Sequence, residues 1–91
     1  MCTYRTELVP VRGSGKGASG WFRVTDASVY LDHPIHAPAG HTLNIDVRNP
    51  SLGPAARVAL ELDAPSARAL AEAILAVVDT APTALLEELT S

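Results

Sequence analysis

The stretch HTLNIDVRNPSLGPAARVALELD, residues 41–63, decides the fold of this protein. Apolar and polar residues alternate over 41–48 and again over 56–62, and a period of two is typical of β-strands with one buried face. The breaker-rich segment 49–54 predicts a turn between the two strands. The residues expected to face the core are His41, Leu43, Ile45 and Val47 in the first strand and Ala56, Val58, Leu60 and Leu62 in the second.

Two further strands are predicted upstream, over Thr3–Val11 and Trp21–Leu31. The segment 13–20 between them contains four of the six glycines, so we expect a loop there rather than a regular element. Pro10 predicts that the first strand lies at an edge of the sheet. Both faces of the second strand carry apolar residues, which indicates a central strand or a bulge near Asp26.

A long helix is predicted directly after this hairpin. Asp63 is suited to cap it and Pro65 to occupy its first turn. Pro82 ends it, and residues 83–91 form a short tail helix. The long helix carries an apolar stripe at the helical spacing i, i+3, i+4, i+7, made of Ala67, Leu70, Ala71, Ile74, Val77 and Val78.

Strands followed by a helix predict an α+β fold. We expect an antiparallel sheet of about four strands with one long C-terminal helix packed on a face and a short tail helix. Residues 1–81 form a single domain and residues 82–91 the tail. The chain has 91 residues, of which 47% are hydrophobic and only 4% aromatic. A core of small aliphatic side chains in a chain of this size gives only marginal stability. We therefore expect a homodimer, through an exposed sheet edge or through the tail residues Leu85, Leu86 and Leu89.

Composition argues against several classes of function. The net charge is −3 and Lys16 is the only lysine, so nucleic acid is not an expected partner. The single cysteine excludes an internal disulfide and fits a cytoplasmic protein. The N-terminus has no apolar leader, and the most apolar stretch, 69–78, is far shorter than the roughly 20 residues of a membrane helix. The glycine-rich segment 13–20 fails the P-loop pattern, so no nucleotide cofactor is expected.

Cys2, His33, His36 and His41 form the candidate metal site. If the first two strands pair so that residue numbers sum to about 32–34, Cys2 lies across from the end of the second strand, beside His33. The connection between the second and third strands starts and ends at that same edge. Four nitrogen and sulfur ligands match a tetrahedral zinc site, and iron, nickel or copper also accept imidazole ligands. The pattern therefore predicts a protein that binds zinc or another transition metal.

Other interpretations of these residues stay open. Loop histidines often hydrogen-bond the backbone instead of a metal. Cys2 is also a candidate nucleophile with His33 or His41 as its base, so the sequence leaves open whether the protein is an enzyme. Alternatively, the protein is a non-enzymatic homodimeric module for a protein or small-molecule partner. Its ligand groove would then be lined by Asn44, Asp46, Arg48, Arg57 and Glu61 on the polar side of the last two strands.

Several segments resemble a family of small uncharacterised actinobacterial proteins. They are CTYRT (2–6), GSGKGA (13–18), DHPIHAP (32–38), HTLNID (41–46) and SARALAEAI (66–74). The resemblance covers nearly the whole chain. It implies a bacterial, cytoplasmic protein and, because the family has no established activity, it implies no catalytic residues.

Overall fold

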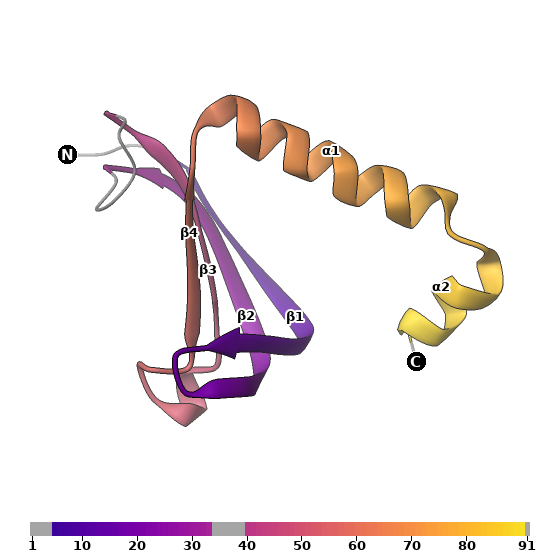
Figure 1. Cartoon of the computed structure of the whole chain (residues 1–91), viewed down its shortest axis with the longest axis horizontal. Coiled ribbons are helices and arrows are strands. Elements are labelled where there is room, and N and C mark those ends of the chain that lie inside the picture. Colours follow the sequence, from indigo (N-terminus) through magenta and orange to yellow (C-terminus); the bar gives the residue numbers. More distant parts are fainter. Residues whose placement is uncertain (1–4, 34–39, 91) are drawn as a thin grey trace.

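A computed structural model describes residues 5–33 and 40–90 and confirms the α+β fold (Figure 1). Four antiparallel strands form one sheet in the order β1-β2-β3-β4, so each strand pairs with the next along the chain. The elements are β1 (Thr6–Gly17), β2 (Gly20–Asp32), β3 (Thr42–Arg48), the 3-10 helix η1 (Pro50–Leu52), β4 (Arg57–Leu62), α1 (Ala64–Thr80) and α2 (Thr83–Thr90).

The glycine-rich segment is not a loop, and the prediction for it was wrong. β1 and β2 continue through it and end at the pair Gly17 and Gly20. A Cβ atom on Gly17 would lie 3.3 Å from the carbonyl oxygen of Arg57, and one on Gly15 would lie 3.4 Å from Cγ2 of Val58. Figure 1 shows this hairpin tip turning across the end of the sheet towards β4. The glycines therefore allow the hairpin tip to approach β4 closely, and they do not make the segment a flexible loop.

β2 is a central strand, which was one of the two alternatives predicted for it, and the bulge that was the other alternative lies in its neighbour β1. The β1–β2 register shifts between Pro10 and Gly13 of β1, opposite the part of β2 that contains Asp26. An extra residue on one strand bends that strand and increases its twist. The bulge therefore lies where the hairpin tip begins to turn. Pro10 is on an edge strand, as predicted.

The sheet buries its polar face better than its apolar face. Thr42, Asn44 and Asp46 of β3 are only 2%, 8% and 7% exposed, although they were expected to point away from the core. Their neighbours Leu43, Ile45 and Val47, which were expected to face a core, are only half-buried. On the apolar side Leu60 is 44% exposed. The expected burial is therefore reversed within one chain.

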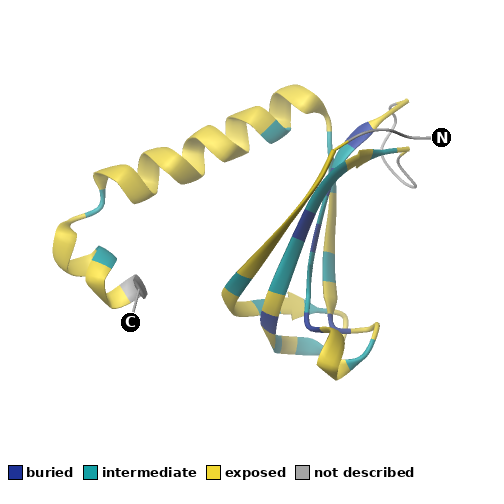
Figure 2. Cartoon of the chain, turned by 180° about the vertical axis from the view of Figure 1, so that it is seen from behind, coloured by how far each residue is buried: buried dark blue, intermediate teal, exposed yellow. Residues whose placement is uncertain are grey.

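The position of helix α1 accounts for the exposure of the apolar face. It begins as predicted, since the Asp63 side chain accepts a hydrogen bond from the backbone N–H of Ser66 at 2.8 Å. Its main contact with the sheet is to β3, after which it extends away from the strands (Figures 1 and 2). No residue of α1 is buried, and Ile74 is 55% exposed.

Among the described helices none is long and apolar enough to span a membrane.

Candidate functional site

The polar face of the sheet centres on the carboxylate of Asp46. The Tyr30 hydroxyl donates to its Oδ2 at 2.7 Å. The Nε and Nη2 of Arg57 donate to its Oδ1 at 3.1 and 2.7 Å. The hydrogen bond to Asp46, together with burial, raises the pKa of the Tyr30 phenol above its usual value. Three strands thus join in one charged network.

Small polar side chains surround this network. Ser28 and Asn44 are 5% and 8% exposed, and the Thr42 hydroxyl donates to Oδ1 of Asn44 at 2.6 Å. Asn49, at the end of β3, donates from Nδ2 to the Arg23 carbonyl oxygen at 3.0 Å and accepts from the N–H of Ser51. Asn49 therefore fixes the start of the β3–β4 connection against β2.

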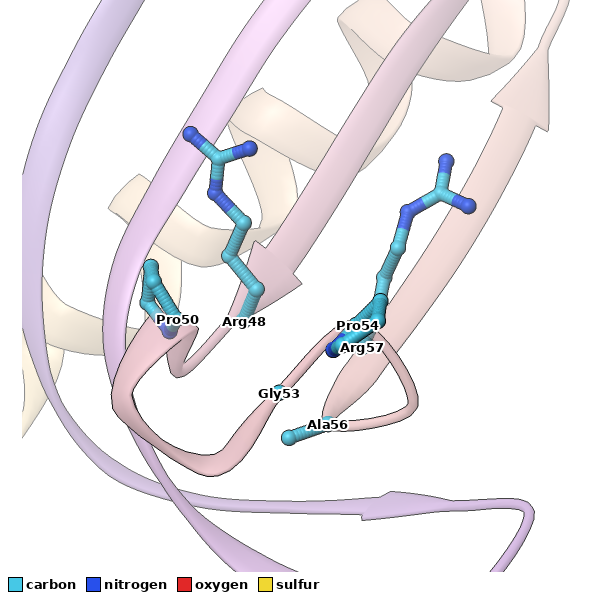
Figure 3. Close-up of a pocket in the computed structure, with 6 residues that line it drawn as sticks. All are labelled: Arg48, Pro50, Gly53, Pro54, Ala56 and Arg57. Atoms are coloured by element: carbon cyan, nitrogen blue, oxygen red, sulfur yellow. The ribbon is translucent and has the colours of Figure 1, made fainter.

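A pocket of about 370 Å³ opens where the polar face meets this connection. Arg48 and Arg57 pair directly across β3 and β4, so their side chains leave the same face, and Figure 3 shows them side by side above the connecting loop. The Nε of Arg48 is buried and is the one such side-chain atom, among the described residues, that has no hydrogen-bond partner. The pocket is lined by Arg48, Pro50, Gly53, Pro54, Ala56 and Arg57.

Sequence reasoning found part of this site. It placed Asp46, Arg48 and Arg57 on one polar face, and the structure brings them together there. It did not connect Tyr30 with that face. The missing signal was the β2–β3 register, in which Tyr30 lies opposite Asn44 and Ser28 opposite Asp46.

The predicted metal ligands are only partly within the described residues, because Cys2 and His36 lie outside them. The structure does bring His33 and His41 together, with ring centroids 4.3 Å apart and an angle of 36° between the planes. The Nδ1 of His33 lies 3.0 Å from the carbonyl oxygen of Gly40. A carbonyl only accepts, so Nδ1 carries the proton in this contact. The two rings thus meet where β2 ends and β3 begins.

The predicted zinc-binding function was wrong. Over residues 5–33 and 40–90 no group of three or more His, Cys, Asp or Glu side chains is placed to hold a metal, whereas a zinc site needs at least three protein ligands. The register behind the prediction also differs from the one that forms. Thr6 pairs with Tyr30, so paired residue numbers sum to 36 before the bulge. Because the strands continue through the glycine segment as far as Gly17 and Gly20, the paired residue numbers have a larger sum than the predicted 32–34.

Comparison with known proteins gives a family but no activity. Neither a curated protein nor a solved structure matches the chain. A family defined only as being of unknown function, DUF6295, matches residues 1–87. The actinobacterial distribution implied by the resemblance stays a prediction. Because the match covers nearly the whole chain, the protein belongs to the DUF6295 family of unknown function.

Proposed function

We propose that the protein is a non-enzymatic binding module that holds a small organic anion, one bearing a carboxylate or phosphate group, in the Arg48–Arg57 pocket. The observation that carries this proposal is the buried, unpartnered Nε of Arg48. Leaving a buried donor unsatisfied costs about 1–3 kcal/mol, and more for a charged group. An oxyanion in the pocket would accept from this nitrogen and remove that cost.

The pairing of the two arginines supports an anionic ligand. Like charges directly opposite each other on neighbouring strands repel, and Arg48 and Arg57 are such a pair. Asp46 occupies the Nε–Nη2 edge of Arg57 and so orients its guanidinium. Guanidinium groups bind carboxylate and phosphate oxygens through parallel hydrogen bonds. An oxyanion between the two groups would relieve the repulsion.

The size and lining of the pocket favour a small organic molecule. Its volume of about 370 Å³ is near the lower end of the roughly 300–1,000 Å³ typical of ligand sites. Pro50, Pro54 and Ala56 supply an apolar part of its lining. Such a lining suits the carbon skeleton of a short organic acid or a phosphorylated metabolite.

The test is a titration followed by backbone amide shifts in NMR, with citrate and inorganic phosphate as probes. We expect saturable shifts confined to the β3–β4 connection and its flanking residues. Arg48→Gln should weaken binding at least tenfold, because a neutral amide lacks the charge and the donor geometry of a guanidinium.

Arg23→Gln is the matched control, since it removes the same charge from an exposed side chain on β2 outside the pocket. It should bind both probes like the unmodified protein. Equal weakening by the two variants, or shifts scattered over the whole surface, would show general charge attraction and contradict the proposal.

A further inference from the structure

The apolar side of the sheet and the apolar stripe of α1 both lack a cover within the described chain. They enclose an open groove of about 600 Å³. Val24 and Ala56 are the only buried hydrophobic residues among those described, and Figure 2 shows α1 exposed along nearly all of its length. The groove is lined by Val29, Leu31, Leu43 and Ile45 from the sheet and by Ala64, Ala67, Arg68, Leu70, Ala71, Glu72, Ile74 and Leu75 from α1.

The exposed area is too large for a compact monomer. The chain exposes 7001 Å², whereas a compact protein of 9.5 kDa exposes about 5,000 Å². Its radius of gyration is 14.8 Å, against about 12 Å for a compact chain of 91 residues. The excess of about 2,000 Å² per chain is about 4,000 Å² for a pair, which falls within the range of about 2,000–5,000 Å² for obligate homodimers.

We propose that a second copy of this chain covers the groove, with α1 of each copy lying on the apolar sheet face of the other. Each chain offers both halves of such a contact, because the open sheet face and the open helix stripe line the same groove. A two-fold interface must be self-complementary. This reciprocal exchange of helices meets that condition and gives both apolar surfaces a partner.

The charges at the rim of the groove favour a second copy over an unrelated partner. Arg68 and Glu72 are four residues apart on α1 and both line the groove. Where the two α1 helices also run antiparallel beside the two-fold axis, Arg68 of one copy faces Glu72 of the other, and the reverse pair forms at the same time. The interface differs from a sheet edge or the α2 tail, and it does not depend on the anion pocket, whose two arginines are outside the groove lining.

The first test measures the mass of the full chain in solution by light scattering during size exclusion. We expect twice the chain mass of 9.5 kDa. Ile74→Asp should yield a single-chain or unfolded species, because it places a carboxylate in the interface. Ala73→Asp is the control, since it introduces the same charge one residue away at an exposed position outside the groove lining, and it should stay dimeric. A monomeric unmodified protein, or a dimeric Ile74→Asp, would overturn the proposal.

The second test does not depend on any variant folding. Chains labelled with carbon-13 on isoleucine methyl groups are mixed with unlabelled chains, and contacts between the two kinds are selected by isotope filtering. We expect contacts between Ile74 of one copy and the sheet residues Leu43 and Ile45 of the other. If Ile74 contacts these residues only within its own chain, the helix closes onto its own sheet and no exchange takes place.

Discussion

The two faces of the sheet are completed in different ways. On the polar face Asp46, Tyr30 and Arg57 satisfy one another within a single chain, and Asp46 is 7% exposed. On the apolar face Leu31 and Leu60 remain 41% and 44% exposed. Burial of a charged group demands partners with defined geometry, and this chain supplies them locally. Burial of apolar area demands only coverage, which another molecule can provide.

The largest effect expected on the polar face comes from Asp46→Ala. This change removes the acceptor of both Tyr30 and Arg57, and hydrogen bonds to a charged group are each worth about 1.5–3 kcal/mol. Because the Arg57 side chain is half exposed, its share is discounted. We expect a loss of about 2–3 kcal/mol in the free energy of unfolding, measured by urea denaturation, with no change of mass in solution.

Leu60→Ala provides the contrast on the other face. Leu60 lies opposite Ile45 in the β3–β4 register and is exposed in the single chain. If a second copy covers that face, this variant shifts the mass in sedimentation towards a single chain while Asp46→Ala does not. An equal shift in both variants would remove the distinction between the two faces.

A smaller effect is expected where the hairpin tip packs on β4. Gly17→Ala places a Cβ 3.1 Å from Cε1 of Phe22 and 3.3 Å from the Arg57 carbonyl oxygen, and a backbone atom has little room to move. Overpacking of this kind costs about 1–3 kcal/mol, and we expect the lower half of that range in thermal or urea unfolding. Gly13→Ala is the control, because its nearest contact is an ordinary 3.9 Å. Equal stability of the two variants would mean that the hairpin tip is not closely packed against β4.

The sequence predicted the elements well because their signals are local. Alternation in β3 and β4 and the Asp63 cap each depend on a few neighbouring residues, and the strands and helix formed there. The hairpin register was mispredicted because Gly15 and Gly17 were counted as flexible, although they are needed for contact with β4. That single error made the predicted pairing sums of 32–34 smaller than the observed 36.

The candidate site was harder to predict than the fold. The polar side of β3 could be recognised from alternation, but its partners come from other strands and depend on register. Alternation also says which residues share a face without saying which face is covered. Which face is covered depends on the direction in which α1 continues after Ala67. The apolar stripe of α1 has the same helical period whether the helix packs on the sheet of its own chain or on the sheet of a second copy.

Tyr30→Phe should lower the free energy of unfolding by about 1 kcal/mol, because it removes one hydrogen bond from the polar network. The pKa of Tyr30 is raised above 10.0 in the folded protein, chiefly by its hydrogen bond to Asp46. Its contribution to stability is therefore fully present below pH 10 and is lost as the pH rises through the folded value. Phenolate absorbance should show one tyrosine titrating late, and Tyr30→Phe should abolish that component. An unchanged titration would place the Tyr30 hydroxyl away from Asp46.

The smallest effect is expected at the fully exposed cap of α1. Hydrogen bonds from the Ser66 hydroxyl and backbone N–H lower the pKa of Asp63 below 3.8. The stabilisation by its carboxylate is therefore present above that value and is lost as the pH falls through the lowered one. Asp63→Ala should have a slightly lower melting temperature than the unmodified protein at neutral pH. In acid the two melting temperatures should become equal.

Asp63→Asn separates the charge from the cap, because an asparagine also accepts a hydrogen bond at this position. It should keep most of the stability at neutral pH but lose the acid dependence. If α1 lies on a second copy, weakening its first turn also affects the interface, so the Asp63→Ala variant should dissociate at a higher protein concentration than the Asp63→Asn variant. Identical dissociation of the two would show that the first turn of α1 is held by the sheet of its own chain, independently of the cap.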